Sequence, residues 1–289
     1  MAKAVSRSFQ GRFDHFYGVD FSGARLAGTN MWIARLTPGK NRYELADLNR
    51  VADLCGCADR DPAMKFLVDQ VLHSDRAVWG MDFPFGLPIE IMPTGSTWQD
   101  QLAWVAKHPG GAYELGEECV RRSVAARNTM HIRRETDTQS KAPFDCYHYR
   151  IIYQTYHGMR DVLLPLSRTR GVAILPFQYR RLQRAQSIVV EACPSSTLKR
   201  LGLPHQNYKQ PTGGPLTAKR RRTRRTILEA LMERVKFSPR HRRTVMRNPG
   251  GDALDAVIAA LGAADAFLDA DHPSIARHPR YRLEGRLYV

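Results

Sequence analysis

Phe16-Tyr17-Gly18-Val19-Asp20-Phe21 is a short, mostly apolar run with one acid near its end, and the small residues Ser22-Gly23-Ala24 follow it. A run of this length and composition is typical of a buried strand, and the small residues favour a turn. Two more runs of this kind follow at 31–36 and 43–49. The gaps between the three runs are short, whereas parallel strands need a long crossover, so we expect an antiparallel meander.

The next elements extend this meander into a mixed sheet. Residues 62–72 place apolar side chains at helical spacing after Pro62, which predicts a helix. Residues 77–82 and 187–192 are mostly apolar, as in strands that are buried on both faces. We therefore expect an α/β fold whose mixed five-stranded sheet is flanked by helices. A meander followed by a crossover helix and a fourth strand is similar to the order of the ribonuclease H-like fold.

The segment between the fourth and fifth strands differs from the rest of the chain. Its pattern predicts helices at 98–107, 113–127 and 147–164. We interpret residues 95–170 as a helical insertion that serves as a lid or a recognition element. The other expected boundaries are a flexible polar arm at 1–15, a core at 16–94 and 171–289, and core helices at 218–236 and 252–268.

Length and composition are those of an ordinary globular protein. The chain has 289 residues, of which 43% are hydrophobic and 25% are charged. No stretch approaches the ~20 apolar residues that a membrane-spanning helix needs. The polar N-terminus leads into no apolar run, so no signal peptide is indicated. The five cysteines contain no Cys-x-x-Cys pair, which favours reduced thiols over a zinc site. We expect a cytoplasmic protein without a membrane partner.

The charge of the chain is strongly positive and unevenly distributed. The formal net charge is +16. Residues 219–247 alone contain 12 Lys and Arg and two Glu, which gives +10 in 29 residues. Charge of this size bears on the partners of a protein rather than on its fold. Among anionic partners we expect nucleic acid, DNA or RNA, ahead of an anionic membrane surface or an acidic protein.

Acids lie at the ends of several expected elements. Asp20 is at the end of the first strand, Asp82 at the end of the fourth, and Glu191 near the end of the fifth. Asp252 and Asp255 fall in the first turn of the last helix, three residues apart and therefore on one helix face. Sites in open α/β sheets form beyond the carboxyl ends of the strands. These five acids are therefore our candidate catalytic residues.

Several carboxylates in one place repel each other unless a cation neutralises them. Carboxylate oxygens favour Mg²⁺ or Mn²⁺, and two such ions can bind both oxygens of a phosphoryl transfer. We expect Asp20, Asp82, Asp252 and Asp255 to bind the metal. A structural role stays open for each acid; Asp252, for example, could be the N-cap of its helix after Gly250-Gly251.

The ordered set of motifs around these acids resembles a known family. The motifs are Tyr17-Gly18-Val19-Asp20-Phe21-Ser22-Gly23, Gly80-Met81-Asp82-Phe83-Pro84-Phe85-Gly86-Leu87-Pro88, Val190-Glu191-Ala192-Cys193-Pro194-Ser195, Asp252-Ala253-Leu254-Asp255-Ala256-Val257 and Glu284-Gly285-Arg286-Leu287-Tyr288. Over about 17–288 they look like the "domain of unknown function 429" family, whose members are predicted nucleases of ribonuclease H-like fold. The final helix also looks like that of Holliday-junction resolvases, which have paired acids there. The resemblance implies the fold and a metal site, and it assigns no activity.

Basic side chains at two places are candidates for contacts with phosphate. The run at the start of helix 218–236 opposes the helix dipole, a cost that a bound phosphate would remove, although a solvated or disordered run is the alternative. In the insertion, arginines flank tyrosines at 149, 153 and 156, which either stack on bases or pack onto the core. The candidate nucleic-acid-binding residues are Lys219, Arg220, Arg221, Arg222, Arg224, Arg225, Arg150 and Arg160.

The acids and the charge together predict a metal-dependent nuclease, a hydrolase that cleaves phosphodiester bonds of nucleic acid. The alternative is a non-catalytic nucleic-acid-binding protein of the same fold. An actin-like, ATP-using enzyme is a third hypothesis, because residues 18–23 resemble the first phosphate turn of actin and sugar kinases. That class needs two copies of the fold and a second glycine-rich loop. This chain has room for one copy and lacks the loop.

Overall fold

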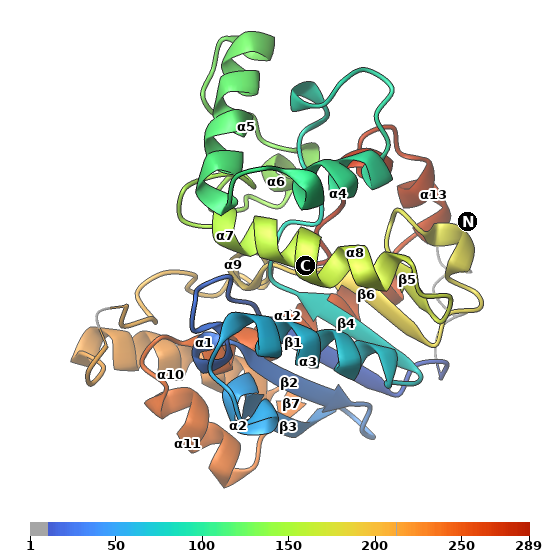
Figure 1. Ribbon diagram of the computed structural model, residues 1–289. Helices are drawn as coiled ribbons and strands as arrows, with labels where there is room; N and C mark the ends of the chain where they lie inside the picture. Colours follow the sequence, from blue (N-terminus) through green and yellow to red (C-terminus); the bar gives the residue numbers. More distant parts are fainter. Residues whose placement is uncertain (1–10, 212) are drawn as a thin grey trace.

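The computed structural model describes residues 11–211 and 213–289, which form a mixed sheet flanked by helices (Figure 1). The predicted α/β class is therefore confirmed. The strands lie in the order β5-β6-β4-β1-β2-β3-β7. Their bounds are β1 (His15–Asp20), β2 (Trp32–Thr37), β3 (Tyr43–Arg50), β4 (Ala77–Met81), β5 (Val172–Ile174), β6 (Ser187–Glu191) and β7 (Val235–Lys236).

The strand directions bring three carboxyl ends to one edge of the sheet. β1, β2 and β3 form the expected antiparallel meander. The crossover from β3 to β4 contains α2 (Val51–Cys55) and α3 (Arg60–Leu72). β4 then runs parallel to β1, and β6 runs parallel to β4. The last residues of β1, β4 and β6 are therefore neighbours, which is the arrangement that the candidate acids require.

Within the described residues the sheet has seven strands, and two short edge strands correct the expectation of five. β5 and β7 lie at the two edges of the sheet and have three and two residues. Runs this short have no periodicity by which a sequence pattern could identify them. The other five strands are those expected, with every boundary within one residue of the expected range.

α12 (Asp252–Asp269) packs directly on one face of the sheet. Two glycines allow this close approach: a Cβ on Gly18 would lie 2.1 Å from the carbonyl oxygen of Ala256, and a Cβ on Gly80 would lie 2.5 Å from Cβ of Ala263. The helix is buried along most of its length. The close packing fixes the first turn of α12 relative to the ends of β1 and β4.

No helix within the described part of the chain is long and apolar enough to cross a membrane.

The segment between β4 and β5 is largely helical. α7 (Ile152–His157), the π-helical turn η4 (Gly158–Leu163) and α8 (Leu164–Ser167) form one continuous run in front of the sheet (Figure 1). The helix expected from residue 147 begins only at Ile152. The residues before it form a turn, in which the backbone N–H groups of Ile151 and Ile152 both donate to the carbonyl oxygen of His148. Above this run lie α4 (Trp98–Lys107), α5 (Ala112–Arg127) and α6 (Glu135–Gln139).

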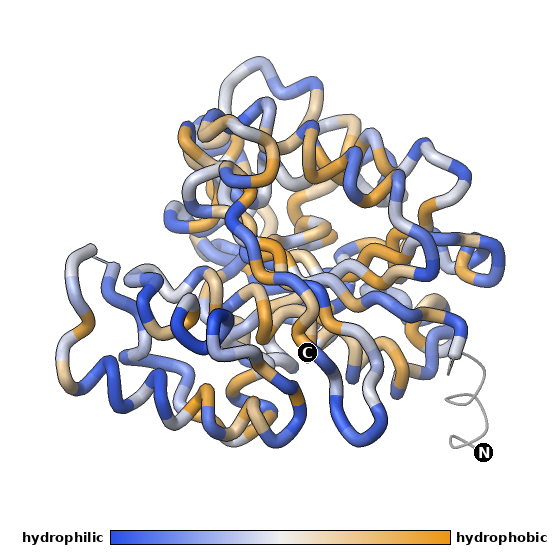
Figure 2. The backbone as a smooth tube through the Cα atoms, turned by 90° about the horizontal axis from the view of Figure 1, so that it is seen from below, coloured by the Kyte–Doolittle hydropathy of each residue, from blue (hydrophilic) through white to orange (hydrophobic). Residues whose placement is uncertain are grey.

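The remaining helices surround the sheet, and hydrophilic residues line many of the outer turns of the chain (Figure 2). α10 (Ala218–Met232) ends before the expected position 236, because β7 begins at Val235.

Of the expected arm 1–15, residues 1–10 lie outside the described residues, and Phe13 is buried with its ring 5.3 Å from that of Phe267. The other elements are α1 (Ala27–Asn30), η3 (Ile89–Ile91), η5 (Tyr179–Arg181), α9 (Pro194–Arg200), α11 (Pro239–Arg247), α13 (His272–Arg277) and α14 (Tyr281–Glu284).

Candidate functional site

Four of the five candidate acids meet at the carboxyl end of β1 and β4. Asp20 ends β1, Asp82 directly follows β4, and Asp252 and Asp255 lie in the first turn of α12. We call these four residues the carboxylate cluster. Asp255 is 1% exposed, and the other three are partly buried. The sequence pattern therefore identified a group of acids that the fold brings together from three separate elements.

The acids of this cluster affect each other's ionisation. Burial raises the pKa of Asp20 well above its usual value, and the charges of Asp255, Asp252 and Asp82 raise it further. Burial, with a contribution from Asp255, raises the pKa of Asp82 to about 7. Burial also raises the pKa of Asp252. Among the residues that the structure describes, no N–H or O–H group donates a hydrogen bond to the carboxylates of Asp20 and Asp82.

Lys209 supplies a positive charge beside the cluster, and sequence reasoning missed it. Its ammonium group pairs with the Oδ2 atom of Asp255, whose Oδ1 atom accepts a hydrogen bond of 2.8 Å from the hydroxyl of Tyr208. The charge of Lys209 lowers the pKa values of Asp20, Asp82 and Asp252 against the effect of burial. Lys209 belongs to a polar loop without periodicity, so only the fold shows that it reaches the acids.

Arg224 holds this loop in place. Its guanidinium group is fully buried and donates to the carbonyl oxygens of Tyr208 (2.9 Å), Val245 (3.0 Å) and Pro249 (3.0 Å). These bonds tie the segment around Tyr208 to the loop that precedes α12. Arg224 is one of the candidate nucleic-acid-binding residues, but in this structure its guanidinium cannot reach a phosphate. Its role here is to position the segment that contains Lys209.

The alternative role of Asp252 as a helix cap is wrong. The N-cap of α12 is Gly251, whose φ of 88° lies in the left-handed region that favours glycine. Asp252 is the first helical residue, and its Oδ2 atom accepts a hydrogen bond of 3.3 Å from the side-chain amide of Asn248. The Oδ1 atom of Asn248 accepts one from the backbone N–H of Ala253. Asn248 therefore performs the capping that was considered for Asp252, whose carboxylate faces the cluster.

Glu191, the fifth candidate acid, is engaged in a different network. Its Oε2 atom accepts hydrogen bonds from Nη1 of Arg134 (2.9 Å) and from the backbone N–H of Phe85 (3.0 Å). Arg134 also pairs with Asp137 (2.7 Å), and its Nη1 donates to the carbonyl oxygen of Glu284. Arg134, Asp137 and Glu191 are all buried, and we call these three residues the arginine-paired cluster. With its oxygens bonded in this way, Glu191 is not available as a metal ligand in this structure.

A cleft of about 310 Å³ opens over both clusters. Asp82, Asp255 and Lys209 line it together with Phe144 and Arg150 from the helical segment. The guanidinium of Arg150 lies 5.6 Å from the centre of the Phe144 ring. One of the candidate nucleic-acid-binding residues therefore lines the same cleft as two of the acids.

Other candidate basic and aromatic residues are divided between internal contacts and the surface. Arg160 pairs with Asp161 and donates to the hydroxyl of Tyr156 at 2.7 Å, so it is engaged within the helical segment. Tyr156 is buried, whereas Tyr149 and Tyr153 are exposed. Arg220 donates to the side chain of Gln210. The candidates on α10 whose side chains are exposed are Lys219, Arg221, Arg222 and Arg225.

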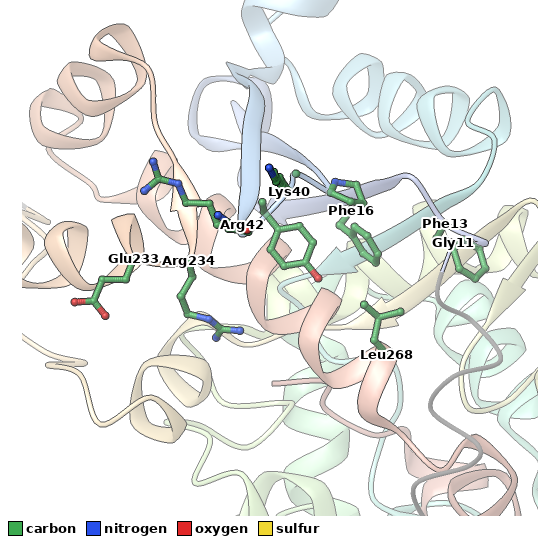
Figure 3. A pocket seen from close by; sticks show the side chains of 12 residues that line it. Gly11, Phe13, Phe16, Lys40, Arg42, Glu233, Arg234 and Leu268 are labelled. Atoms are coloured by element: carbon green, nitrogen blue, oxygen red, sulfur yellow. The ribbon is translucent and has the colours of Figure 1, made fainter.

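A larger cavity, of about 440 Å³, lies elsewhere and contains none of the candidate residues. Figure 3 shows Lys40, Arg42 and Arg234 on one side of it and Phe16 and Leu268 on another. Phe16 is near the start of β1, so this cavity is at the opposite end of that strand from Asp20. Its lining contains basic side chains and Glu233, so it does not bring several carboxylates together.

The donor chemistry of the carboxylate cluster suits a hard divalent ion, but one of its acids, Asp255, already pairs with an ammonium group. Within residues 11–211 and 213–289, no three His, Cys, Asp or Glu side chains are placed so that they could hold a metal ion. Lys209 instead neutralises part of the cluster. A metal ion would therefore have to replace the ammonium group next to Asp255.

Comparison with protein-family models, with curated proteins and with solved structures gives no match for this chain. The function must therefore be inferred from the site itself.

Proposed function

We propose that the protein is a divalent-metal-dependent nuclease of ribonuclease H-like fold, related to the family that its motifs resemble. The observation that supports this most is the meeting of Asp20, Asp82, Asp252 and Asp255 at the carboxyl end of two parallel strands, where one ammonium group pairs with Asp255. An antiparallel meander that leads through a crossover helix into a parallel fourth strand also agrees with the proposed fold. The substrate would be DNA or RNA, in keeping with the net charge of +16.

The residues present are chemically suited to Mg²⁺ or Mn²⁺. Carboxylate oxygens are the ligands that these ions prefer. The carboxylates of Asp20 and Asp82 are desolvated, and burial of an unpartnered charge is costly unless a cation is bound. Asp20, Asp82, Asp252 and Asp255 would hold the ion, and Lys209 would turn away from Asp255. A bound ion would lower the pKa of a water and stabilise the charge that develops on the phosphate during hydrolysis.

The side chains that line the cleft would then position the phosphodiester. Arg150 lines the same cleft as Asp82 and Asp255 and would bind a phosphate oxygen of the substrate. Lys209, once released from Asp255, would keep its positive charge next to the same phosphate. Glu191 and Arg134 would hold the floor of the cleft rigid, because every charge in that network is paired.

The decisive experiment measures cleavage and binding with the same protein. Asp82→Asn should abolish cleavage of labelled single strands, duplexes, RNA–DNA hybrids and four-way junctions in Mg²⁺ or Mn²⁺. Its affinity for the same oligonucleotides should stay equal or rise, because one charge that repels phosphate is lost. Asp269→Asn is the matched control, since that side chain is exposed and lies at the opposite end of α12 from Asp252 and Asp255. Equal cleavage by wild type and Asp82→Asn would place the activity elsewhere.

A non-catalytic nucleic-acid-binding protein is the second candidate function. The observation that favours it is the pairing of Lys209 with Asp255, which already neutralises part of the cluster. In that case wild type would bind the oligonucleotides tightly and cleave none of them with either metal. The same assay therefore separates the two functions.

A further inference from the structure

We propose that a groove between α11 and Trp32 binds the sugar–phosphate backbone of one nucleic-acid strand and leads it to the carboxylate cluster. This inference rests on the proposed function and extends it, because it identifies where the substrate lies outside the cleft. The groove has a volume of about 370 Å³. Trp32, Arg240, Arg243, Thr244, Arg247 and Asn248 line it.

The basic residues of the groove share one face of α11. Arg240, Arg243 and Arg247 follow each other at spacings of three and four, which places their side chains in one row. All three are exposed, while Val245 on the same helix is buried against the core. The helix is therefore anchored by its apolar side and presents three guanidinium groups to solvent along the groove.

These arginines have neither a buried position like Arg224 nor an anionic partner like Arg234 and Lys236. Arg224 is buried among carbonyl oxygens, Arg234 pairs with Asp265, and Lys236 pairs with Glu44. Within the part of the chain that the structure describes, no acid pairs with Arg240, Arg243 or Arg247. Three like charges along two turns of a helix repel each other, and a polyanion beside them would remove that repulsion.

The groove leads to the proposed catalytic acids at one end. Asn248 lines the groove, and its side-chain amide donates to the carboxylate of Asp252. Trp32 pairs with Asp20 across β1 and β2, so the two side chains leave the sheet on the same face. A strand whose phosphates follow the α11 arginines would therefore pass directly to Asp20 and Asp252. The basic groove offsets the repulsion that the acids exert on a phosphate.

The charge arrangement selects a phosphodiester backbone as the occupant. Arginines in a row match phosphates that repeat along a strand, and their forked donors bind phosphate oxygens in pairs. Contacts of this kind position a strand without reading its bases. Binding at the groove should therefore depend strongly on salt and weakly on sequence.

The test compares two double variants of equal charge change. Arg243→Ala/Arg247→Ala removes two groove arginines, and Arg180→Ala/Arg184→Ala removes two exposed arginines near η5, away from the acids. Affinity for a labelled oligonucleotide is measured by fluorescence anisotropy over a range of NaCl concentrations. EDTA is present throughout, so the result does not depend on metal or on cleavage. Thermal unfolding of each variant serves as the folding control.

The groove variant should bind about tenfold more weakly than wild type and lower the slope of log affinity against log salt by about 0.9 for each lost phosphate contact. The control variant should change both quantities much less. Equal losses in the two variants, or none in the groove variant, would overturn the proposal. If the groove variant does not fold, the test uses the wild-type protein instead and measures how far the oligonucleotide quenches its tryptophan fluorescence. Trp32→Phe is the reference, because it lacks the tryptophan that lines the groove. Quenching that is the same in Trp32→Phe would also overturn it.

Failure of this inference and failure of the proposed function give different results. Unchanged binding by the groove variant together with cleavage that Asp82→Asn abolishes would reject the groove alone. A wild-type protein that binds through the groove and cleaves nothing would reject the nuclease and keep the groove. Binding to vesicles of anionic lipid without binding to any oligonucleotide would reject the groove as a nucleic-acid site.

Discussion

Two groups of buried acids line the same cleft, and they are neutralised in opposite ways. In the arginine-paired cluster, Arg134 binds both Asp137 and Glu191, and further N–H groups complete the bonding of the carboxylate oxygens. In the carboxylate cluster, the ammonium of Lys209 pairs with Asp255, and its charge also lowers the pKa values of the other three acids. Acids at one sheet edge therefore have a structural role where N–H groups bond to their carboxylate oxygens. Where such hydrogen-bond donors are missing, the carboxylate oxygens can bind a ligand.

The largest effect expected from this comparison concerns stability. Arg134→Met would leave Glu191 and Asp137 buried without their partner, and loss of one partner of a buried ion pair costs about 3–5 kcal/mol. Asp20→Asn in the carboxylate cluster should leave the free energy of unfolding unchanged or raise it, because it removes a repelling charge. Urea denaturation in EDTA measures both. A similar loss of stability in the two variants would show that the clusters do not differ as described.

The second effect is a pH dependence that belongs to the carboxylate cluster. Burial raises the pKa of Asp82 from 3.8 to about 7, so between these values the folded state keeps a proton that the unfolded chain releases. The stability that this group contributes is complete below pH 3.8 and is lost as the pH rises towards 7. In EDTA, wild type should therefore lose stability relative to Asp82→Asn across this range. A constant difference between the two proteins would mean that Asp82 titrates normally.

The smallest effect sharpens the role of Lys209. Lys209→Met removes the ammonium group from Asp255 and keeps most of the side-chain volume. Mn²⁺ should then bind about tenfold more tightly, or about 1.4 kcal/mol, because no cation has to be displaced. Lys219→Met, at an exposed position on α10, is the control for the loss of one positive charge. Calorimetry that shows equal or weaker Mn²⁺ binding by Lys209→Met would mean that Lys209 does not compete with the ion.

The strands and the acids at their ends could be predicted from the sequence because both depend on local pattern. Apolar runs such as 77–82 define a buried strand, and an acid that follows one must lie at a sheet edge. The choice of Asp20 and Asp82 needed nothing beyond that pattern. The fold subsequently showed that the first turn of α12 lies at the same edge.

Long-range partners could not be predicted, because no local pattern specifies them. Glu191 has the same strand-end position as Asp82, yet Arg134, 57 residues earlier in the chain, occupies its oxygens. Arg224 belongs to a basic run that predicts surface exposure, yet it is buried among backbone carbonyl oxygens. Lys209 reaches Asp255 from a loop without periodicity. In each case the role of a charge is decided by which residue from a distant segment lies beside it.

The most direct test of the metal site is the anomalous scattering of crystals grown with Mn²⁺. The carboxylate cluster should contain an anomalous peak bound by oxygens of Asp20, Asp82, Asp252 and Asp255, with the ammonium of Lys209 displaced from Asp255. The arginine-paired cluster should contain no peak in the same crystal. A map in which Lys209 still pairs with Asp255 and no Mn²⁺ lies among these acids would contradict the account.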